Sequence, residues 1–443
     1  MRSDQQQAIN RLAGTSATAF LCAVLCVYPL YIDKFSNLGV TKFTGCFTLF
    51  LLFLLWLVAC TAIGARAPRP RNANAGRDVT LWGVLAFAGT SLISTFTSLS
   101  PTASTWGLGG YYGGLMLVLF TAAGYWAVRS YLDLENLDFV FWVLGITTSI
   151  VAVLYVLNIF NIDLIGAYAD TAVVERAQFF STLGQKDFNG CFFSVALPIV
   201  FYQFLNAKDT RTAVWTGIPA AFGALALAVV DSEALALGIG AAVMVLVCHK
   251  NFTTRHLRRA ALISAAFFGW AAWMHYMRAS VYTQGGTALL AKLGAWQVAL
   301  PCMAASLLLW LVLFVLARKG IAAQAPLYLP GRVITIAVLA VGALAFVLAN
   351  AMPNLPLPES LHNLLVFNDD WGTYRGVAWR AAFGTWADGS LLRKIVGIGP
   401  GMMHTAVAAW AGDAMTARMA TFYAAHNEYL EQLLTTGILG LAA

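Results

Sequence analysis

The sequence predicts an all-α, polytopic membrane protein: a bundle of about twelve transmembrane helices with one long loop folded as a helical cap. Hydrophobic residues make up 60% of the 443 residues and charged residues only 11%, with a mean hydropathy of +0.72. That balance lies well outside the range of soluble domains. Apolar runs of about 20 residues, the length that crosses a bilayer as a helix, also recur along the chain.

Apolar windows that predict membrane spans follow one another up to residue 349, so residues 1–349 are expected to form a transmembrane bundle. A further apolar run begins near residue 427 and continues to Ala443. Residues 427–443 are therefore expected to start another membrane helix, in a protein that continues beyond them. The earlier windows are 16–32, 45–63, 79–98, 113–128, 139–160, 188–205, 212–230, 234–248, 260–277, 298–317 and 333–349.

Basic residues predict the orientation, because Lys and Arg concentrate in cytoplasmic loops. They favour the loops on the side of the N-terminus, which places the N-terminus in the cytoplasm and residues 350–426 outside. The net charge of +7 then reflects topology and anchoring to anionic lipid, as in the run Arg255–Arg259, and predicts a lipid bilayer and no nucleic acid as partner. The seven cysteines show no metal-ligand spacing with histidine, so no metal is expected.

Residues 350–426 form a loop too rich in aromatic residues for a solvated linker. We expect an extracytoplasmic cap with short interfacial helices. Its aromatic residues include Trp371, Tyr374, Trp379, Phe383, Trp386, Trp410, Phe422 and Tyr423.

The segment 371–386 is predicted to be a helix that carries two arginines. Trp371, Arg375 and Trp379 are spaced four apart and share a face, whereas Arg380 lies about 140° round the helix from Arg375. Arginine suits phosphate oxygens because its planar fork donates hydrogen bonds in pairs. The alternative is that both side chains reach lipid headgroups between interfacial tryptophans.

The glycines between Gly397 and Gly401 predict a turn that folds the cap, because neither a preceding strand nor a following Lys-Ser or Lys-Thr pair marks a nucleotide loop. His362 and His404, which flank this turn, show no pattern that assigns them a role.

His426 and Asn427 stand where the polar segment ends and the last apolar run begins. If a helix begins near Asn427, its dipole disfavours imidazolium and attracts anionic groups such as a diphosphate. A neutral His426 there is a candidate general base for a hydroxyl nucleophile. The alternative is a surface histidine at the start of a helix.

Charged residues at the outer ends of other windows are also candidate site residues. Asp231 and Glu233 lie between two adjacent windows, either facing a cavity or in a hairpin exposed to water. The run 184–190 brings Lys186, Asp187 and Asn189 together, with Arg176 upstream, where they would line the outer mouth of the same cavity.

These motifs, in this order, resemble the O-antigen ligase and O-antigen polymerase superfamily, the Wzy-C-type membrane proteins. The matching elements are the arginine-aromatic helix Tyr374-Arg-Gly-Val-Ala-Trp-Arg380, the turn Gly397-Ile-Gly-Pro-Gly401, the segment Ala425-His-Asn-Glu-Tyr-Leu430 and the run Thr436-Gly-Ile-Leu-Gly-Leu441. The sequence departs from the family at Asp231-Ser-Glu-Ala234, where many members carry Ser-x-Arg-Gly.

The resemblance implies a glycosyltransferase of the bacterial cytoplasmic (inner) membrane. Such an enzyme moves a glycan from an undecaprenyl-diphosphate carrier to a hydroxyl acceptor (a glycan, glycolipid or other group) and needs no metal or other cofactor. By analogy His426 activates or orients the acceptor hydroxyl. The resemblance makes substrate-binding candidates of Arg375, Arg380, Asn427, Tyr429, Arg176 and Lys186.

Two other classes of protein remain open from the sequence. A transporter or flippase of lipid-linked glycans would require ionisable residues near mid-membrane and inverted repeats. The chain shows few such residues and an ordered cap instead. The second of these classes is a non-catalytic membrane scaffold whose cap binds a partner.

Overall fold

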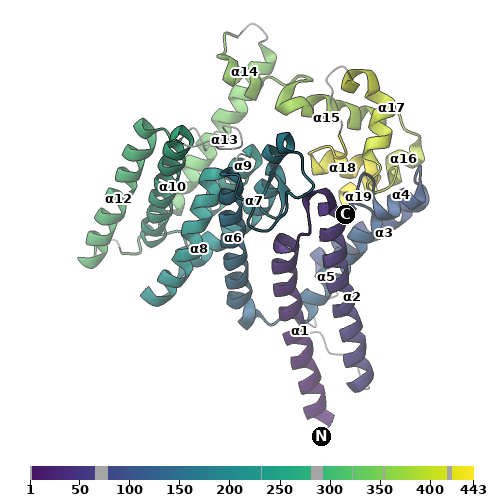
Figure 1. The fold of residues 1–443 in the computed structure, drawn as a ribbon, viewed down its shortest axis with the longest axis horizontal. Helices are drawn as coiled ribbons and strands as arrows, with labels where there is room; N and C mark the ends of the chain where they lie inside the picture. Colours follow the sequence, from purple (N-terminus) through teal and green to yellow (C-terminus); the bar gives the residue numbers. More distant parts are fainter. Residues whose placement is uncertain are drawn as a thin grey trace. The chain divides into compact units, whose positions relative to one another are not determined.

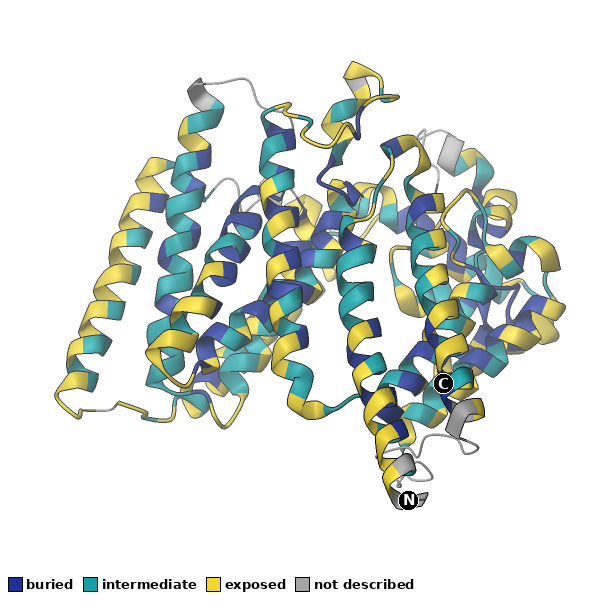
Figure 2. Ribbon diagram, turned by 60° about the horizontal axis from the view of Figure 1, so that its bottom comes forward, coloured by how far each residue is buried: buried dark blue, intermediate teal, exposed yellow. Residues whose placement is uncertain are grey.

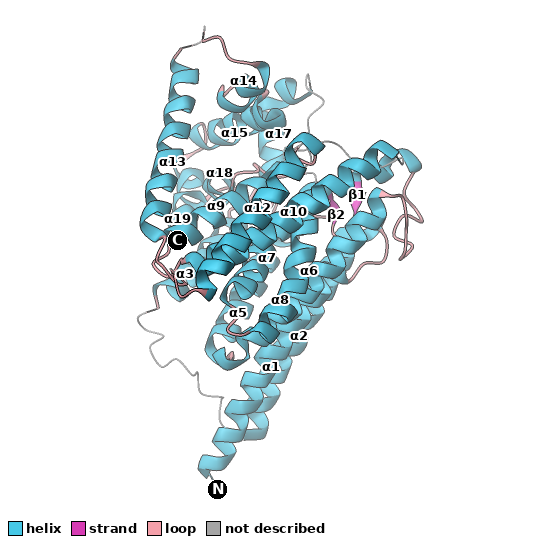
Figure 3. Ribbon diagram, turned by 90° about the vertical axis from the view of Figure 1, so that its left-hand side faces the viewer, coloured by secondary structure: helices cyan, strands magenta, loops and turns pink. Residues whose placement is uncertain are grey.

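The computed structural model describes residues 2–64, 78–230, 232–280, 293–321, 323–352, 355–416 and 422–443. Most of these residues lie in helices and very few in strands, which confirms the predicted all-α class (Figure 3). A short antiparallel hairpin pairs β1 (Phe179–Phe180) with β2 (Gly184–Gln185), Phe179 opposite Gln185.

Eight of the described helices are long and apolar enough to cross a membrane, so the chain is a polytopic helical membrane protein. All eleven predicted windows overlap helices. Three of them fall in helices outside that set of eight: α5 (Leu115–Tyr131), α9 (Glu233–Cys248) and α10 (Thr254–Ser280). The eight spans are Gln6–Leu30, Phe35–Cys60, Val79–Phe96, Leu134–Ile159, Lys186–Asn206, Thr210–Val229, Trp296–Arg318 and Tyr328–Ala351.

Side-chain caps explain where several helices begin. The Asp209 carboxylate accepts the Thr212 backbone N–H at 2.8 Å and starts α8 (Thr210–Val229). Asp78 starts α3 (Val79–Phe96) in the same way and also forms an ion pair with Arg129 at the end of α5. These caps satisfy backbone donors that have no partner within the helix.

The chain divides into two compact units, and three long helices pass from one to the other: α1 (Arg2–Leu30), α2 (Leu38–Gly64) and α13 (Tyr328–Ala351). We call residues 18–49 and 133–338 the central unit. In it α8 packs against α6, α7 and α10, and α10 packs against α12 (Figure 1). Besides α8, α9, α10 and the β-hairpin, it contains η1 (Phe35–Asn37), η3 (Leu134–Asn136), α6 (Leu137–Ile159), η4 (Val173–Gln178), α7 (Lys186–Asn206) and α12 (Trp296–Arg318).

We call residues 1–17, 50–132 and 339–443 the C-terminal unit. Residues 350–443 thus belong to the same compact unit as α3 and α5. Helices α15, α17 and α18 pack together around Val377, Met403, Val407 and Leu434 (Figure 1). Besides α3 and α5, it contains α4 (Pro101–Trp106), α14 (Glu359–Leu365), α15 (Trp371–Ala387), α16 (Leu391–Val396), α17 (Met403–Thr416), α18 (Glu428–Thr435) and α19 (Gly437–Ala442).

Apolar side chains stay exposed along the candidate membrane spans. Helix α12 exposes Leu308, Leu311 and Val312, and its ribbon is yellow over most of its length at the left of Figure 2. A large exposed apolar surface is unfavourable in water and typical of a face that meets lipid.

Candidate active site

The turn at His426 joins residue 425 to the start of α18. Asn427 is the N-cap of this helix, and its Oδ1 accepts the backbone N–H groups of Tyr429 at 3.1 Å and Leu430 at 3.3 Å. The helix therefore begins where the sequence predicted. His426 is exposed and has a φ of 51°, in the left-handed region that residues with a side chain rarely adopt.

Side chains from two helices form hydrogen bonds with the backbone N–H and carbonyl of Ala425, the residue before His426. The Trp379 indole Nε1–H of α15 donates to the Ala425 carbonyl at 2.9 Å. The Ala425 N–H donates to the Glu431 carboxylate of α18 at 2.7 Å. Ala425 itself is fully buried. Two elements separated in sequence thus fix the main chain that presents His426.

Glu431 lies on α18, outside the eight candidate membrane spans. Burial raises the pKa of its carboxyl from 4.5 to about 7, against the opposing effect of the hydrogen bond from Ala425. The neighbouring carboxylate of Glu428 also raises this pKa. Glu431 thus binds a proton in a pH range where an exposed glutamate is ionised.

Aromatic rings pack around Trp379. The Trp371 and Trp379 ring centroids lie 5.1 Å apart, and Phe367 lies 5.7 Å from Trp371 and 5.9 Å from Trp379. The Trp371 indole also donates to the Leu364 carbonyl at 3.0 Å. This cluster fixes the start of α15.

The two arginines of α15 have different surroundings. Residues 372–374 have positive φ angles of 60–69°, so the regular helix that was predicted from Trp371 begins only after Tyr374. Arg375 is half-buried, its aliphatic carbons lie against Gly372, and the structure shows no ion pair for it with any described residue. Arg380 is exposed and forms an ion pair with Asp369.

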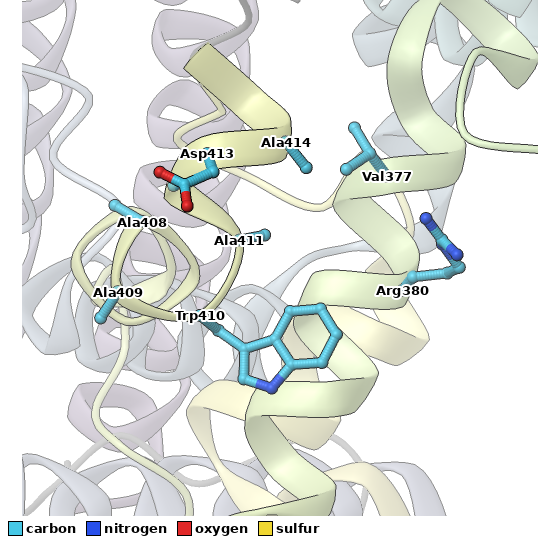
Figure 4. A pocket seen from close by; sticks show the side chains of 9 residues that line it. Val377, Arg380, Ala408, Ala409, Trp410, Ala411, Asp413 and Ala414 are labelled. Atoms are coloured by element: carbon cyan, nitrogen blue, oxygen red, sulfur yellow. The ribbon is translucent and has the colours of Figure 1, made fainter. Parts of the chain in front are cut away.

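Two open cavities flank Arg380. One, of about 390 Å³, lies between α15 and α17 and is lined by Val377, Arg380, Trp410 and Asp413, among others. Figure 4 shows Arg380 and Asp413 on opposite helices of this cavity, with the Trp410 indole below them. The other, of about 430 Å³, is lined by residues 367–370 and Arg380. Arg380 therefore reaches two spaces that could admit a solute.

His404 has a structured environment that the sequence did not signal. Its Nδ1 lies 3.0 Å from the Phe422 carbonyl, and its ring stacks on Tyr423 with centroids 4.4 Å apart. Tyr423 contacts the Tyr111 ring at 5.1 Å, and Phe422 meets His426 edge-on at 6.0 Å. These residues come from three separate segments of the chain, so no local motif could have revealed the stack.

The predicted glycine turn at 397–401 anchors α18. The Ile398 N–H donates to the Leu434 carbonyl at 3.2 Å, and the Gly399 N–H donates to the Thr435 carbonyl at 2.9 Å. The Ser94 hydroxyl of α3 donates to the same Thr435 carbonyl at 2.6 Å.

The last apolar run is interrupted just after α18. Gly437 has a φ of 70°, and α19 follows as a separate helix. Within the described residues the last apolar run therefore forms two short helices with a turn at Gly437 between them.

Arg176 and Lys186 lie in the central unit, apart in sequence and unit from the candidates around α15 and α18. The Arg176 guanidinium lies over the Tyr168 ring, 5.4 Å from its centroid, and Nε contacts the Thr171 carbonyl at 3.5 Å. Lys186 is exposed as the first residue of α7.

Two neighbouring candidates in the central unit have structural partners. The buried Asn189 amide donates to the carbonyls of Phe180, Gly184 and Gln185, so it organises the β-hairpin loop. Asp187 accepts the Ser232 hydroxyl at 3.0 Å. Asp231 lies outside the described residues.

Among the described residues, no group of three or more His, Cys, Asp or Glu side chains could hold a metal ion. No family model, curated protein or solved structure matches this chain.

Proposed function

We propose that this protein is a membrane glycosyltransferase of the O-antigen ligase or polysaccharide polymerase type. It transfers an oligosaccharide from an undecaprenyl-diphosphate carrier to a hydroxyl acceptor. The observation that carries the proposal is the anchored, exposed His426 beside α15. Trp379 bonds to the residue before His426, and Arg375 lies one helical turn from Trp379, about 6 Å along the axis. The candidate base His426 and the half-buried cation Arg375 are thus both connected to α15.

The chemistry assigns a role to each residue. The acceptor hydroxyl oxygen attacks the anomeric carbon of the glycan, and the bond from that carbon to the diphosphate oxygen breaks. His426 takes the hydroxyl proton, and the diphosphate leaves with the bonding electron pair. Arg375 binds the diphosphate and also stabilises the negative charge that develops on it as the bond breaks, because a fixed cation lowers the free energy of that charge.

The membrane setting belongs to the same proposal. In it the chain has about twelve spans, the N-terminus is cytoplasmic and residues 350–426 form a cap on the outer face of the bacterial inner membrane. Asn427 and Tyr429 contact the acceptor, and Arg380 is a second contact to the donor beside Arg375. The apolar faces of the spans accommodate the polyprenyl chain.

The test compares the purified protein with its His426→Ala variant, given a lipid-diphosphate oligosaccharide and an acceptor. Transfer should fall by about 100-fold or more, the contribution of a general base. His362→Ala, which removes an exposed histidine of α14, is the matched control and should keep its activity. Full transfer by His426→Ala would remove His426 from the chemistry. Movement of the lipid-linked glycan across vesicles without a transfer product would favour a flippase.

A further inference from the structure

The backbone at His426 is in a conformation that needs external support. A φ of 51° costs a residue with a side chain about 1–2 kcal/mol relative to the right-handed region. Such a conformation persists only where surrounding contacts determine it. The contacts that do so here converge on the preceding residue, Ala425.

Those contacts come from two directions. Trp379 binds the Ala425 carbonyl and Glu431 binds its N–H, so both polar groups of one buried peptide residue are fixed by side chains. Glu431 in turn belongs to the helix that Asn427 caps, and its own N–H donates to the Asn427 carbonyl at 2.9 Å. Glu431 is therefore hydrogen-bonded to the residues on both sides of His426, Ala425 and Asn427.

We infer that Trp379 and Glu431 are positioning residues that hold the His426 turn in its left-handed conformation and thereby aim the imidazole at the acceptor. This inference rests on the proposed transferase function. Neither side chain is assigned contact with substrate.

The choice of residue at 431 supports a specific role. A carboxyl group is costly to bury unless it is hydrogen-bonded, and an apolar side chain would fill the same space without that cost. The Glu431 carboxylate accepts one main-chain N–H, that of Ala425, two residues before the helix cap Asn427. Trp379 likewise directs its single indole donor to the same residue.

The experiment measures the conformation of the His426 turn and the rate of glycan transfer separately. Full-length protein in detergent is compared with Glu431→Gln, Glu431→Leu and Trp379→Phe, measuring amide hydrogen exchange at Ala425 and the kinetics of transfer. Glutamine keeps an oxygen acceptor and leucine removes it. One control is Glu428→Gln, which changes an exposed glutamate of α18. The other is Trp386→Phe, which changes a second tryptophan of α15, whose indole donates to the Lys394 carbonyl at 3.2 Å.

In Glu431→Leu, Ala425 should exchange faster and kcat should fall by roughly 10-fold or more, since small misplacements of a catalytic group are costly. Trp379→Phe should show the same loss of kcat, with the KM for the donor changed less than about 2-fold in both variants. Glu431→Gln should restore protection and most of the activity, and both controls should resemble the wild type.

Unchanged exchange at Ala425 in Glu431→Leu would overturn the inference, and so would unchanged kcat in Glu431→Leu and Trp379→Phe. Equal loss in Glu431→Gln and Glu431→Leu would also overturn it, because it would make the charge rather than the bond the active element. If the wild-type protein transfers no glycan, the proposed function fails, and the exchange rates alone decide whether the two side chains hold the turn.

Discussion

The guanidinium of Arg380 is paired with the carboxylate of Asp369, whereas Arg375, one and a half turns earlier on α15, has no such counter-ion among the described residues. The two arginines therefore differ in the positive charge that they offer to a ligand. A half-exposed pair such as Arg380–Asp369 contributes little to stability, yet it neutralises the cation that a diphosphate would need.

Arg375→Gln should consequently weaken donor binding more than Arg380→Gln. We expect the KM for the lipid-diphosphate donor to rise roughly 10-fold for Arg375→Gln, the loss of one charge-assisted hydrogen bond. For Arg380→Gln the rise should stay within about 3-fold. Steady-state kinetics at fixed acceptor concentration measure both, and equal effects would show that the Asp369 pair does not mask Arg380.

The raised pKa of Glu431 predicts how stability depends on pH. Between its unfolded value of 4.5 and its folded value of about 7, the folded protein binds the proton more tightly than the unfolded chain. This contribution is fully present below pH 4.5 and is lost as the pH rises through about 7, by at most about 3 kcal/mol.

Glu431→Gln cannot titrate and should remove this dependence. Its apparent Tm in detergent should rise relative to the wild type as the pH increases from about 5 to about 8. Parallel Tm curves for the two proteins would place the Glu431 pKa near its ordinary value.

Gly397 is predicted to tolerate no side chain. It has a φ of 81°, and a Cβ there would lie 2.2 Å from the Thr435 carbonyl oxygen. Gly397→Ala should therefore destabilise the protein by about 2 kcal/mol or more and loosen α18. Gly412→Ala on α17 is the control, because a Cβ there meets nothing within 4 Å. Thermal unfolding that ranks the two variants equally would contradict this account.

Asn427 is predicted to act first as a helix cap. Asn427→Ala should cost about 1 kcal/mol and increase hydrogen exchange in the first turn of α18. Asn427→Asp keeps an acceptor for the Tyr429 and Leu430 N–H groups and should retain the protection. A loss of transfer in Asn427→Asp without a change in exchange would show that the side-chain amide also contacts substrate.

Local sequence properties predicted much of the fold. Apolar windows became helices because a lipid-embedded segment must satisfy its backbone hydrogen bonds internally, and composition alone reports this. The helix start near Asn427 and the turn at 397–401 were predicted because the residue types that mark them act over a few positions. Windows 113–128 and 234–248 show the limit, since they overlap helices of 17 and 16 residues.

The remaining features depend on contacts between distant segments. The left-handed turn at 372–374 contradicts the helical pattern of its own residues, and nothing nearby in sequence predicts that Asp369 pairs with Arg380. The role of Glu431 was hidden because a glutamate in the first turn of a helix is common for electrostatic reasons. Only the fold shows that its carboxylate accepts the N–H of Ala425.

The bonds that shape the His426 turn end on the main chain of Ala425 and on the Asn427 cap. Replacing the imidazole therefore leaves those bonds in place, and glycine adopts a φ of 51° without steric cost. His426→Gly should fold into an intact scaffold with a notch where the ring had been. Such a vacated scaffold invites chemical complementation, in which imidazole added to the buffer takes over the missing group, and makes this position a natural entry point for redesigning the reaction.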